Sequence, residues 1–249
     1  MITQQDPILE NAIRGNYQLN VWNNCKEAWD KVTGSKAPMW GALGWWFLIL
    51  FGFSLVLGTL SVLLKPFGMK NLVTIIQMIV QYVLTIGFIN GFILLGVRRS
   101  LDTPIRANMV FEGFQQKCFW RSLGTIILTV LIFGIIGAII GATMVGMARM
   151  GILRDLVMLV GSIALFYLAI SYIMAVPLAV IKQLNPWCAL EVSRRTITKK
   201  WFQVLWFWFL LILITLVSVL TLGILFIWTI PMSKIFFGIM YRDMFIGKQ

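Results

Sequence analysis

Hydrophobic and polar positions follow one another in long blocks along the chain. A polar segment, 1–40, is followed by apolar runs that are long enough to cross about 30 Å of hydrocarbon as α-helices. The last run, 202–243, is too long for one crossing, and we divide it near Thr221–Gly223. We therefore expect an all-α membrane domain over 41–246. Its six spans are expected at about 41–64, 72–96, 122–147, 156–181, 202–220 and 223–243.

The polar stretch before the fifth run predicts a short amphipathic helix. Asn185 is a good N-cap, and Pro186 suits the first helical position because its missing N–H costs nothing there. Leu190, Ile197 and Trp201 fall on one stripe, with Trp187 close by. Such a helix lies in the membrane interface, with its apolar face toward the acyl chains and its cations toward the phosphates.

Two earlier stretches have a similar pattern. Within 1–40 the stripe is Trp22, Cys25, Trp29 and Val32. Within 97–122 a helix is expected to be capped by Asp102 or Thr103 and to begin at Pro104; its stripe is Ala107, Val110, Phe111 and Phe114. We expect all three amphipathic helices on the cytoplasmic face.

These surface helices suggest an internal repeat. Trp40, Trp120 and Trp201 each end a surface segment and begin a membrane hairpin, at intervals of 80 and 81 residues. Three copies of a surface helix plus a hairpin would explain the spacing. The alternative is that Trp favours every membrane interface, which requires no repeat.

Composition determines the broad class of protein. Of 249 residues, 59% are hydrophobic and 12% charged, and the mean hydropathy is +0.88. Such values indicate a polytopic membrane protein. The net charge of +12 does not predict nucleic-acid binding, because the cations lie between the apolar runs. The absence of histidine from the sequence excludes histidine-based catalysis, metal ligation and pH switching.

The distribution of cations predicts the orientation. With six spans, 16 of the 21 lysines and arginines lie on one side of the membrane. The positive-inside rule makes that side, and both termini, cytoplasmic. Cys25, Cys118 and Cys188 fall on the same side, where thiols stay reduced. Their spacing matches no zinc pattern, so we expect them to be small apolar residues and no metal to be bound.

Two cation clusters flank the predicted surface helices and are candidates for binding lipid headgroups. They comprise Arg98, Arg99, Lys117 and Arg121, and Arg194, Arg195, Lys199 and Lys200. Cations near an anionic leaflet attract phospholipid by about 1 kcal/mol each. The alternative is that these charges only determine topology during insertion.

Polar residues inside the spans are candidates for a transport path. Gln77, Gln81 and Asn90 lie on the second span, and Lys234 follows Pro231 in the sixth. Interhelical hydrogen bonds explain the amides equally well. Lys234 lies at the midplane if the sixth span begins near 223, and reaches the outer interface if it begins near Thr229.

Small residues in the third span predict close helix packing. Gly134, Gly137 and Gly141 share one face, either within the bundle or at an oligomer seam. The acidic residues after residue 30 are scattered, and no glycine run follows a strand pattern. We therefore expect no cofactor, no nucleotide site and no catalytic constellation.

Three segments resemble a family of uncharacterised six-helix bacterial inner-membrane proteins, the YciC-like proteins. These segments are GFILLGVRRSLDTP, VPLAVIKQLNPWCALEVSRRTITKKWFQVL and IPMSKIFFGIMYRDMF. The pattern is also distantly similar to the membrane domain fused to some glycerophosphodiester phosphodiesterases. The resemblance implies a fold and a bacterial inner-membrane location, and it supplies no catalytic residues.

Together these observations favour a non-enzymatic inner-membrane protein that binds anionic phospholipid and acts as a scaffold or accessory to membrane machinery. The expected partners are lipids, with a homo-oligomer or a larger membrane complex as a further expectation. The alternative function is a small transporter or channel that uses the polar residues of the spans. A lipid-modifying enzyme is the weakest hypothesis, because few acid or base groups are available.

Overall fold

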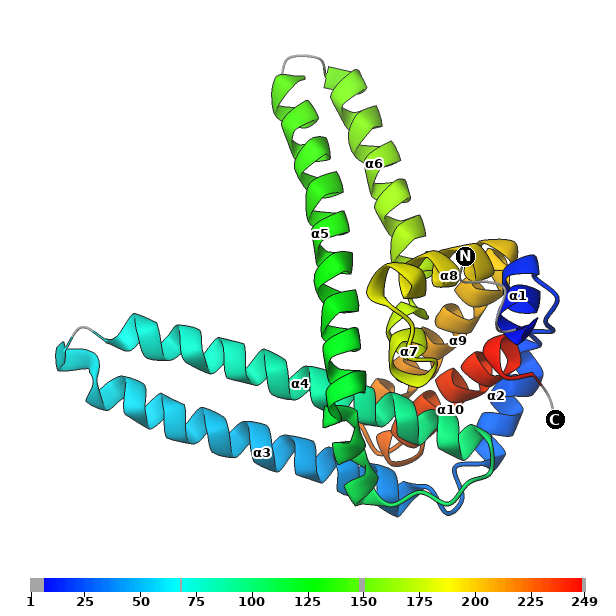
Figure 1. Cartoon of the computed structure of the whole chain (residues 1–249), viewed down its shortest axis with the longest axis horizontal. Helices are drawn as coiled ribbons and strands as arrows, with labels where there is room; N and C mark the ends of the chain where they lie inside the picture. Colours follow the sequence, from blue (N-terminus) through cyan, green and yellow to red (C-terminus); the bar gives the residue numbers. More distant parts are fainter. Residues whose placement is uncertain (1–6, 68, 148–150, 248–249) are drawn as a thin grey trace. The chain divides into compact units, whose positions relative to one another are not determined.

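The computed structural model describes residues 7–67, 69–147 and 151–247, so the first six residues of the predicted N-terminal segment lie outside it. All regular secondary structure in the described residues is helical, without strands (Figure 1). The elements are α1 Pro7–Arg14, α2 Val21–Asp30, α3 Lys36–Leu63, η1 Lys65–Phe67, α4 Lys70–Ser100, η2 Ala107–Phe114, α5 Gln116–Gly146, α6 Gly151–Ser171, α7 Ala175–Ile181, α8 Pro186–Lys199, α9 Trp201–Leu220 and α10 Phe226–Phe245.

The chain divides into two compact units, which are described separately. The first unit contains Met1–Val21, Trp120–Ile212 and Asp243–Gln249. The second unit contains Trp22–Phe119 and Leu213–Arg242.

Five segments of the described chain are long and apolar enough to cross a membrane. They are Lys36–Leu63, Lys70–Ser100, Gln116–Gly146, Gly151–Ile181 and Trp201–Leu220. They agree with the first five predicted spans to within a few residues. The sixth predicted span is found as a helix, α10, but it is not among these five segments. α10 differs from them in the position of its charges, because Lys234 lies near the middle of the helix in addition to Arg242 and Asp243 near its end.

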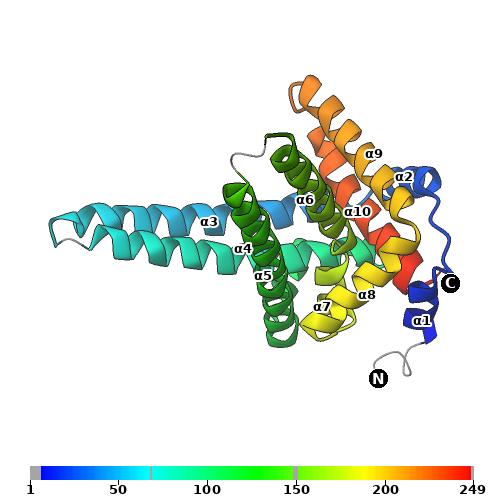
Figure 2. The same ribbon diagram turned by 90° about the horizontal axis from the view of Figure 1, so that it is seen from above.

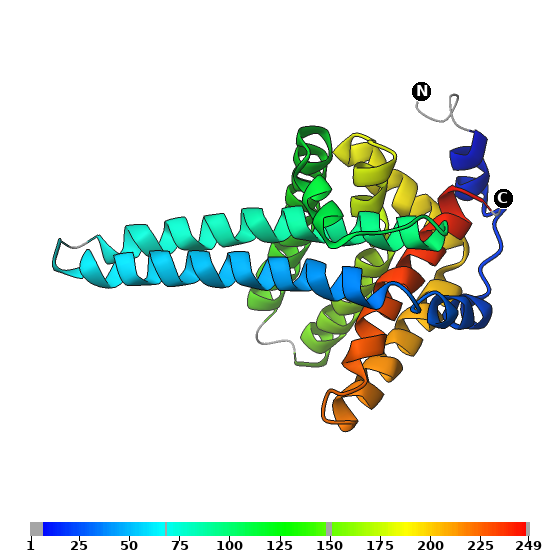
Figure 3. The same cartoon turned by 90° about the horizontal axis from the view of Figure 1, so that it is seen from below.

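In the second unit, α3 and α4 lie side by side as a long hairpin (Figure 3). The η2 segment packs against both helices. A Cβ atom built on Gly91 would lie 2.0 Å from the carbonyl oxygen of Val110, and one on Gly113 would lie 2.1 Å from the carbonyl oxygen of Gly87. The absence of side chains at these glycines therefore lets the η2 backbone lie directly on α4.

The second unit also holds most of α10 against the α3–α4 hairpin. Trp40 donates a hydrogen bond of 3.1 Å to the carbonyl of Ile227, near the start of α10. Further along, a Cβ atom on Gly238 would lie 2.3 Å from the carbonyl oxygen of Gly96. Trp40 lies near the start of α3 and Gly96 near the end of α4, so α10 passes across the hairpin at that end.

In the first unit, the predicted fourth span is interrupted before α7, and Figure 2 shows α7 beside α8. Pro177 cannot donate the helical hydrogen bond to the carbonyl four residues earlier, which favours a break there. The buried Ser193 hydroxyl of α8 donates to the carbonyl of Ser171 at 2.7 Å and accepts from the Met174 amide at 3.2 Å. One side chain therefore satisfies backbone groups on both sides of the break.

The three predicted surface segments have different structures. Both α2 and α8 are α-helices, as expected. The middle segment is a 3-10 helix, η2, whose backbone lies close to α4 at Gly113. The apolar face of α8 is buried against protein: Leu190 is 2% exposed and Ile197 0%. The repeat of three surface helices and hairpins stays a prediction.

Gly134, Gly137 and Gly141 lie on an exposed face of α5. Among the described residues, no atom outside the local helix lies within 4 Å of a Cβ position built on any of the three. This face is available for lipid or for another chain.

Candidate functional site: a basic groove between α1 and α8

The site is built on α8, which begins as the sequence predicts. Asn185 is the N-cap residue with an extended backbone (φ −65°, ψ 150°), and Pro186 occupies the first turn. One face of α8 is buried. The opposite face presents Arg194 and Arg195, and Lys199 lies in the last turn, where the helix dipole favours positive charge.

The short helix α1 packs against α8. The buried Tyr17 hydroxyl donates a hydrogen bond of 3.0 Å to the carbonyl of Thr196, and the ammonium of Lys200 donates to the carbonyl of Tyr17. Gly15 has φ +83°, and a Cβ atom there would lie 3.1 Å from Cβ of Lys199. These contacts, between residues about 180 positions apart, fix α1 alongside the C-terminal half of α8.

An open groove of about 510 Å³ lies between these two helices. Four of the six residues that line this basic groove are cations. The lining residues are Ile13, Arg14, Arg194, Arg195, Thr198 and Lys199.

Two carboxylates hold part of this charge in place. Glu191 accepts hydrogen bonds from Arg194 at 2.9 Å and from Arg195 at 2.5 Å, and Glu10 accepts one from Arg14 at 2.5 Å. The bond from Arg194 is the main reason that the pKa of Glu191 is lowered, so this carboxylate stays charged. The pKa of Arg194 is correspondingly raised.

An excess of positive charge remains in the basic groove. Four cations face two carboxylates, and among the described residues Lys199 forms no ion pair. The groove is open to solvent and wide enough for several heavy atoms. Its chemistry therefore suits a phosphate or another compact anion, which guanidinium groups bind with paired hydrogen bonds.

The other predicted headgroup ligands are placed differently. Arg98 forms two hydrogen bonds to Glu112, at 2.8 and 2.6 Å. Arg99 donates to the carbonyls of Lys31 and Thr33 at 3.0 and 2.8 Å. Lys117 is exposed in the second unit, Arg121 is half-buried in the first, and Lys200 lies 4.8 Å over the Tyr17 ring. Of the eight predicted ligands, Arg194, Arg195 and Lys199 therefore share the basic groove.

None of the four polar residues that are expected inside the spans lines the basic groove. Gln77 is half-buried and Gln81 exposed. Asn90 is buried and donates to the carbonyl of Gly113 at 3.3 Å, a contact that holds η2 on α4. Lys234 is the ninth residue of α10, which begins at Phe226, three residues from each of the two predicted starts. Its ammonium lies 5.7 Å from the centre of the Phe92 ring.

None of the three cysteines lines the basic groove. Cys25, Cys118 and Cys188 are all free thiols. Burial raises the pKa of the Cys25 and Cys188 thiols, which lowers their reactivity at neutral pH. In the part of the chain that the structure describes, no three His, Cys, Asp or Glu side chains gather as metal ligands.

Sequence reasoning missed the contribution of α1. In the sequence, Arg14 is one of the cations that predict topology, and the hydrophobic pattern predicts no helix where the structure has α1, over 7–14. The local signals are Pro7 at the start and the buried pair Leu9 and Ala12 three positions apart. Nothing in the local sequence indicates that α1 docks on α8, because the contact joins opposite ends of the chain.

Comparisons of the chain with protein-family models, with curated proteins and with solved structures find no match.

Proposed function

We propose that the protein is a non-enzymatic bacterial inner-membrane protein that binds anionic phospholipid in the basic groove and acts as a scaffold or accessory to membrane machinery. The observation that carries the proposal is the convergence of Arg14, Arg194, Arg195 and Lys199 from two helices far apart in sequence. A charge that only directs insertion needs no such convergence. Five apolar segments place the groove in a chain suited to a membrane.

Charge neutralisation tests this proposal. The triple variant Arg14→Gln, Arg195→Gln and Lys199→Gln removes three cations from the groove and leaves Arg194 paired with Glu191. At about 1 kcal/mol for each cation, we expect the affinity for phosphatidylglycerol or cardiolipin to fall about a hundredfold. Quantitative lipid mass spectrometry of the purified protein measures this.

The matched control removes three exposed cations outside the groove. Lys26→Gln, Arg106→Gln and Lys117→Gln change the net charge equally. We expect this control to retain its anionic lipid. Equal lipid content in both triple variants would show that the groove has no special role.

We also propose that the N-terminal segment and the end of α10 share the cytoplasmic side of the membrane. Arg242 contacts Glu27 directly, which requires both residues to be on one side and an even number of crossings between them. With five apolar segments, α10 is the candidate for the sixth crossing. Reporters fused after Gly34 and after Gly247 should both report cytoplasm, and a periplasmic signal from one of them would contradict the proposal.

We further propose a relationship to the YciC-like proteins. It rests on the three sequence segments quoted above.

A further inference from the structure

A second cavity in the first unit is entirely apolar. It has a volume of about 530 Å³ and lies between α6 and the start of α9. We call it the apolar furrow; it is lined by Val160, Ile163, Ala164, Phe166, Tyr167 and Trp201. Its residues on α6 extend over about two turns, or roughly 10 Å along the helix.

Aromatic contacts give the furrow a defined wall. The rings of Phe166 and Trp201 meet edge to face, with centroids 6.3 Å apart. The Tyr167 ring also lies 6.3 Å from Trp201. Such ring pairs stabilise one another, so the three aromatic side chains form the wall of a concave surface on an apolar span.

The apolar furrow and the basic groove meet at one hydrogen bond. The hydroxyl of Tyr167, which lines the furrow, lies 2.7 Å from the hydroxyl of Thr198, which lines the groove. Thr198 in turn donates to the carbonyl of Arg194 at 2.7 Å. The apolar furrow therefore lies beside the cations of the basic groove.

We propose that the two cavities form a single site for one anionic glycerophospholipid, with its phosphate in the basic groove and one acyl chain in the apolar furrow. The inference rests on the proposed function and identifies the ligand as a whole lipid rather than a soluble anion. Charge complementarity selects the headgroup. The furrow then selects a ligand whose apolar part is attached directly to that anion, which a free phosphate or an acidic peptide lacks.

The alternative for the furrow is contact with the hydrocarbon of the bulk bilayer. Bulk lipid would fill the furrow without regard to the headgroup. In a single site, by contrast, filling the furrow weakens the binding of long-chain anionic lipid and leaves a ligand without long chains unaffected.

The substitution Ala164→Trp tests this by filling the furrow, since Ala164 is exposed on α6 and the larger side chain displaces no core residue. Ala169→Trp is the matched control, because Ala169 is exposed on the same helix and does not line the furrow. The probes are dioleoyl-phosphatidylglycerol and its dihexanoyl analogue, titrated in detergent and measured by native mass spectrometry.

We expect Ala164→Trp to weaken dioleoyl-phosphatidylglycerol binding at least tenfold and to leave the dihexanoyl lipid unaffected, while Ala169→Trp binds both lipids as the wild type does. The inference is overturned if Ala164→Trp binds the dioleoyl lipid normally, or if the wild type binds both lipids equally. In either case, lost binding in the Arg14, Arg195 and Lys199 triple variant would leave the proposed headgroup function standing. Retained binding in that triple variant would contradict the proposed function as well.

Discussion

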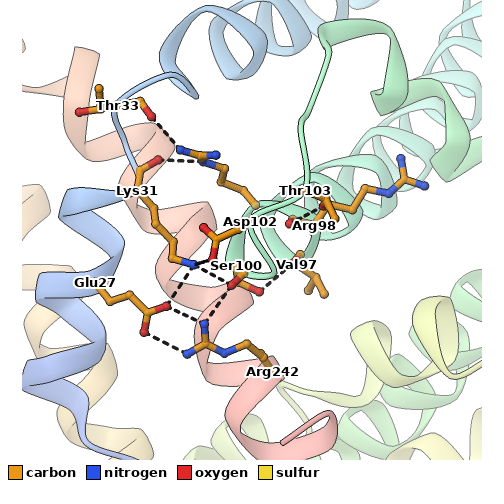
Figure 4. A network of polar contacts seen from close by, with 10 residues as sticks. Glu27, Lys31, Thr33, Val97, Arg98, Ser100, Asp102, Thr103 and Arg242 are labelled. Carbon is orange, nitrogen blue, oxygen red and sulfur yellow. Dashed lines mark hydrogen bonds and ion pairs between the residues drawn. The ribbon is translucent and has the colours of Figure 1, made fainter. Parts of the chain in front are cut away.

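Arg242 near the end of α10 and Glu27 of α2 form a two-point ion pair, although 215 positions separate them. The guanidinium donates to both carboxylate oxygens, at 2.6 and 3.0 Å. It also donates to the carbonyl of Ser100 at 2.9 Å, at the end of α4 (Figure 4). One side chain thus joins three segments of the second unit.

Removing this guanidinium should destabilise the protein substantially. The Arg242 side chain is 11% exposed, and Arg242→Gln removes the shortest ion pair of Glu27 and one of the donors to the Ser100 carbonyl. Lys31 still contacts both groups, at 3.2 and 2.9 Å. We expect a loss of about 2 kcal/mol in unfolding free energy, because hydrogen bonds between charged groups are lost while part of the pairing is retained. Thermal unfolding in detergent, followed by tryptophan fluorescence, measures it. Arg106→Gln, at an exposed cation, is the control; equal melting temperatures for the two variants would contradict the role of Arg242.

The same pair predicts a dependence of stability on pH. Hydrogen bonding from Arg242 is the main reason that the pKa of Glu27 is lowered in the folded protein. A lowered folded pKa adds stability above the unfolded value of about 4.3, and that stability is lost as the pH falls through the folded value. The difference in melting temperature between wild type and Glu27→Gln should therefore be large at pH 7 and should shrink in acid. A difference that is constant with pH would contradict this.

Substitution by alanine should destabilise the protein at Gly91 of α4 and have little effect at Gly137 of α5. Gly91→Ala would put a Cβ atom 2.0 Å from the Val110 carbonyl oxygen, so η2 must move away from α4. We expect a loss of at least about 2 kcal/mol. Gly137→Ala meets open space and should leave the melting temperature within a few degrees of wild type. Equal melting temperatures for the two variants would show that η2 does not pack on α4 as described.

A flux assay of the variant Lys234→Met distinguishes the lipid-binding proposal from the transporter alternative. Its ammonium lies over the Phe92 ring, a contact worth about 0.5–2 kcal/mol. Under the lipid-binding account, Lys234→Met lowers stability modestly and leaves ion and solute flux in proteoliposomes at the background of empty vesicles. A flux that is present in the wild type and abolished by Lys234→Met would support the transporter alternative instead.

The helical spans could be predicted from sequence because they depend on local composition. An apolar run of about twenty residues forms a helix in any membrane protein, since every backbone group must be satisfied internally. The N-cap and first turn of α8 were predictable for the same reason, from Asn185 and Pro186.

The candidate site was only partly predictable because it depends on long-range contacts. The sequence places Arg98 and Lys199 in equivalent basic clusters, yet Arg98 is paired with Glu112, whereas Lys199 lines the basic groove and forms no ion pair among the described residues. Which cation stays available depends on whether a carboxylate or a carbonyl from elsewhere in the chain reaches it. The glycines show the same limit: Gly91 contacts η2, whereas Gly137 in the more obvious small-residue pattern faces open space.

Photo-crosslinking tests whether anionic phospholipid occupies the basic groove. A phosphatidylglycerol analogue with a diazirine in its headgroup is incorporated into vesicles with the purified protein, irradiated and mapped by peptide mass spectrometry. The account predicts adducts concentrated on 7–14 and 191–199, which are lost in the Arg14, Arg195 and Lys199 triple variant and absent with a phosphatidylcholine analogue. Adducts spread evenly over the surface segments, or the same pattern with phosphatidylcholine, would contradict it.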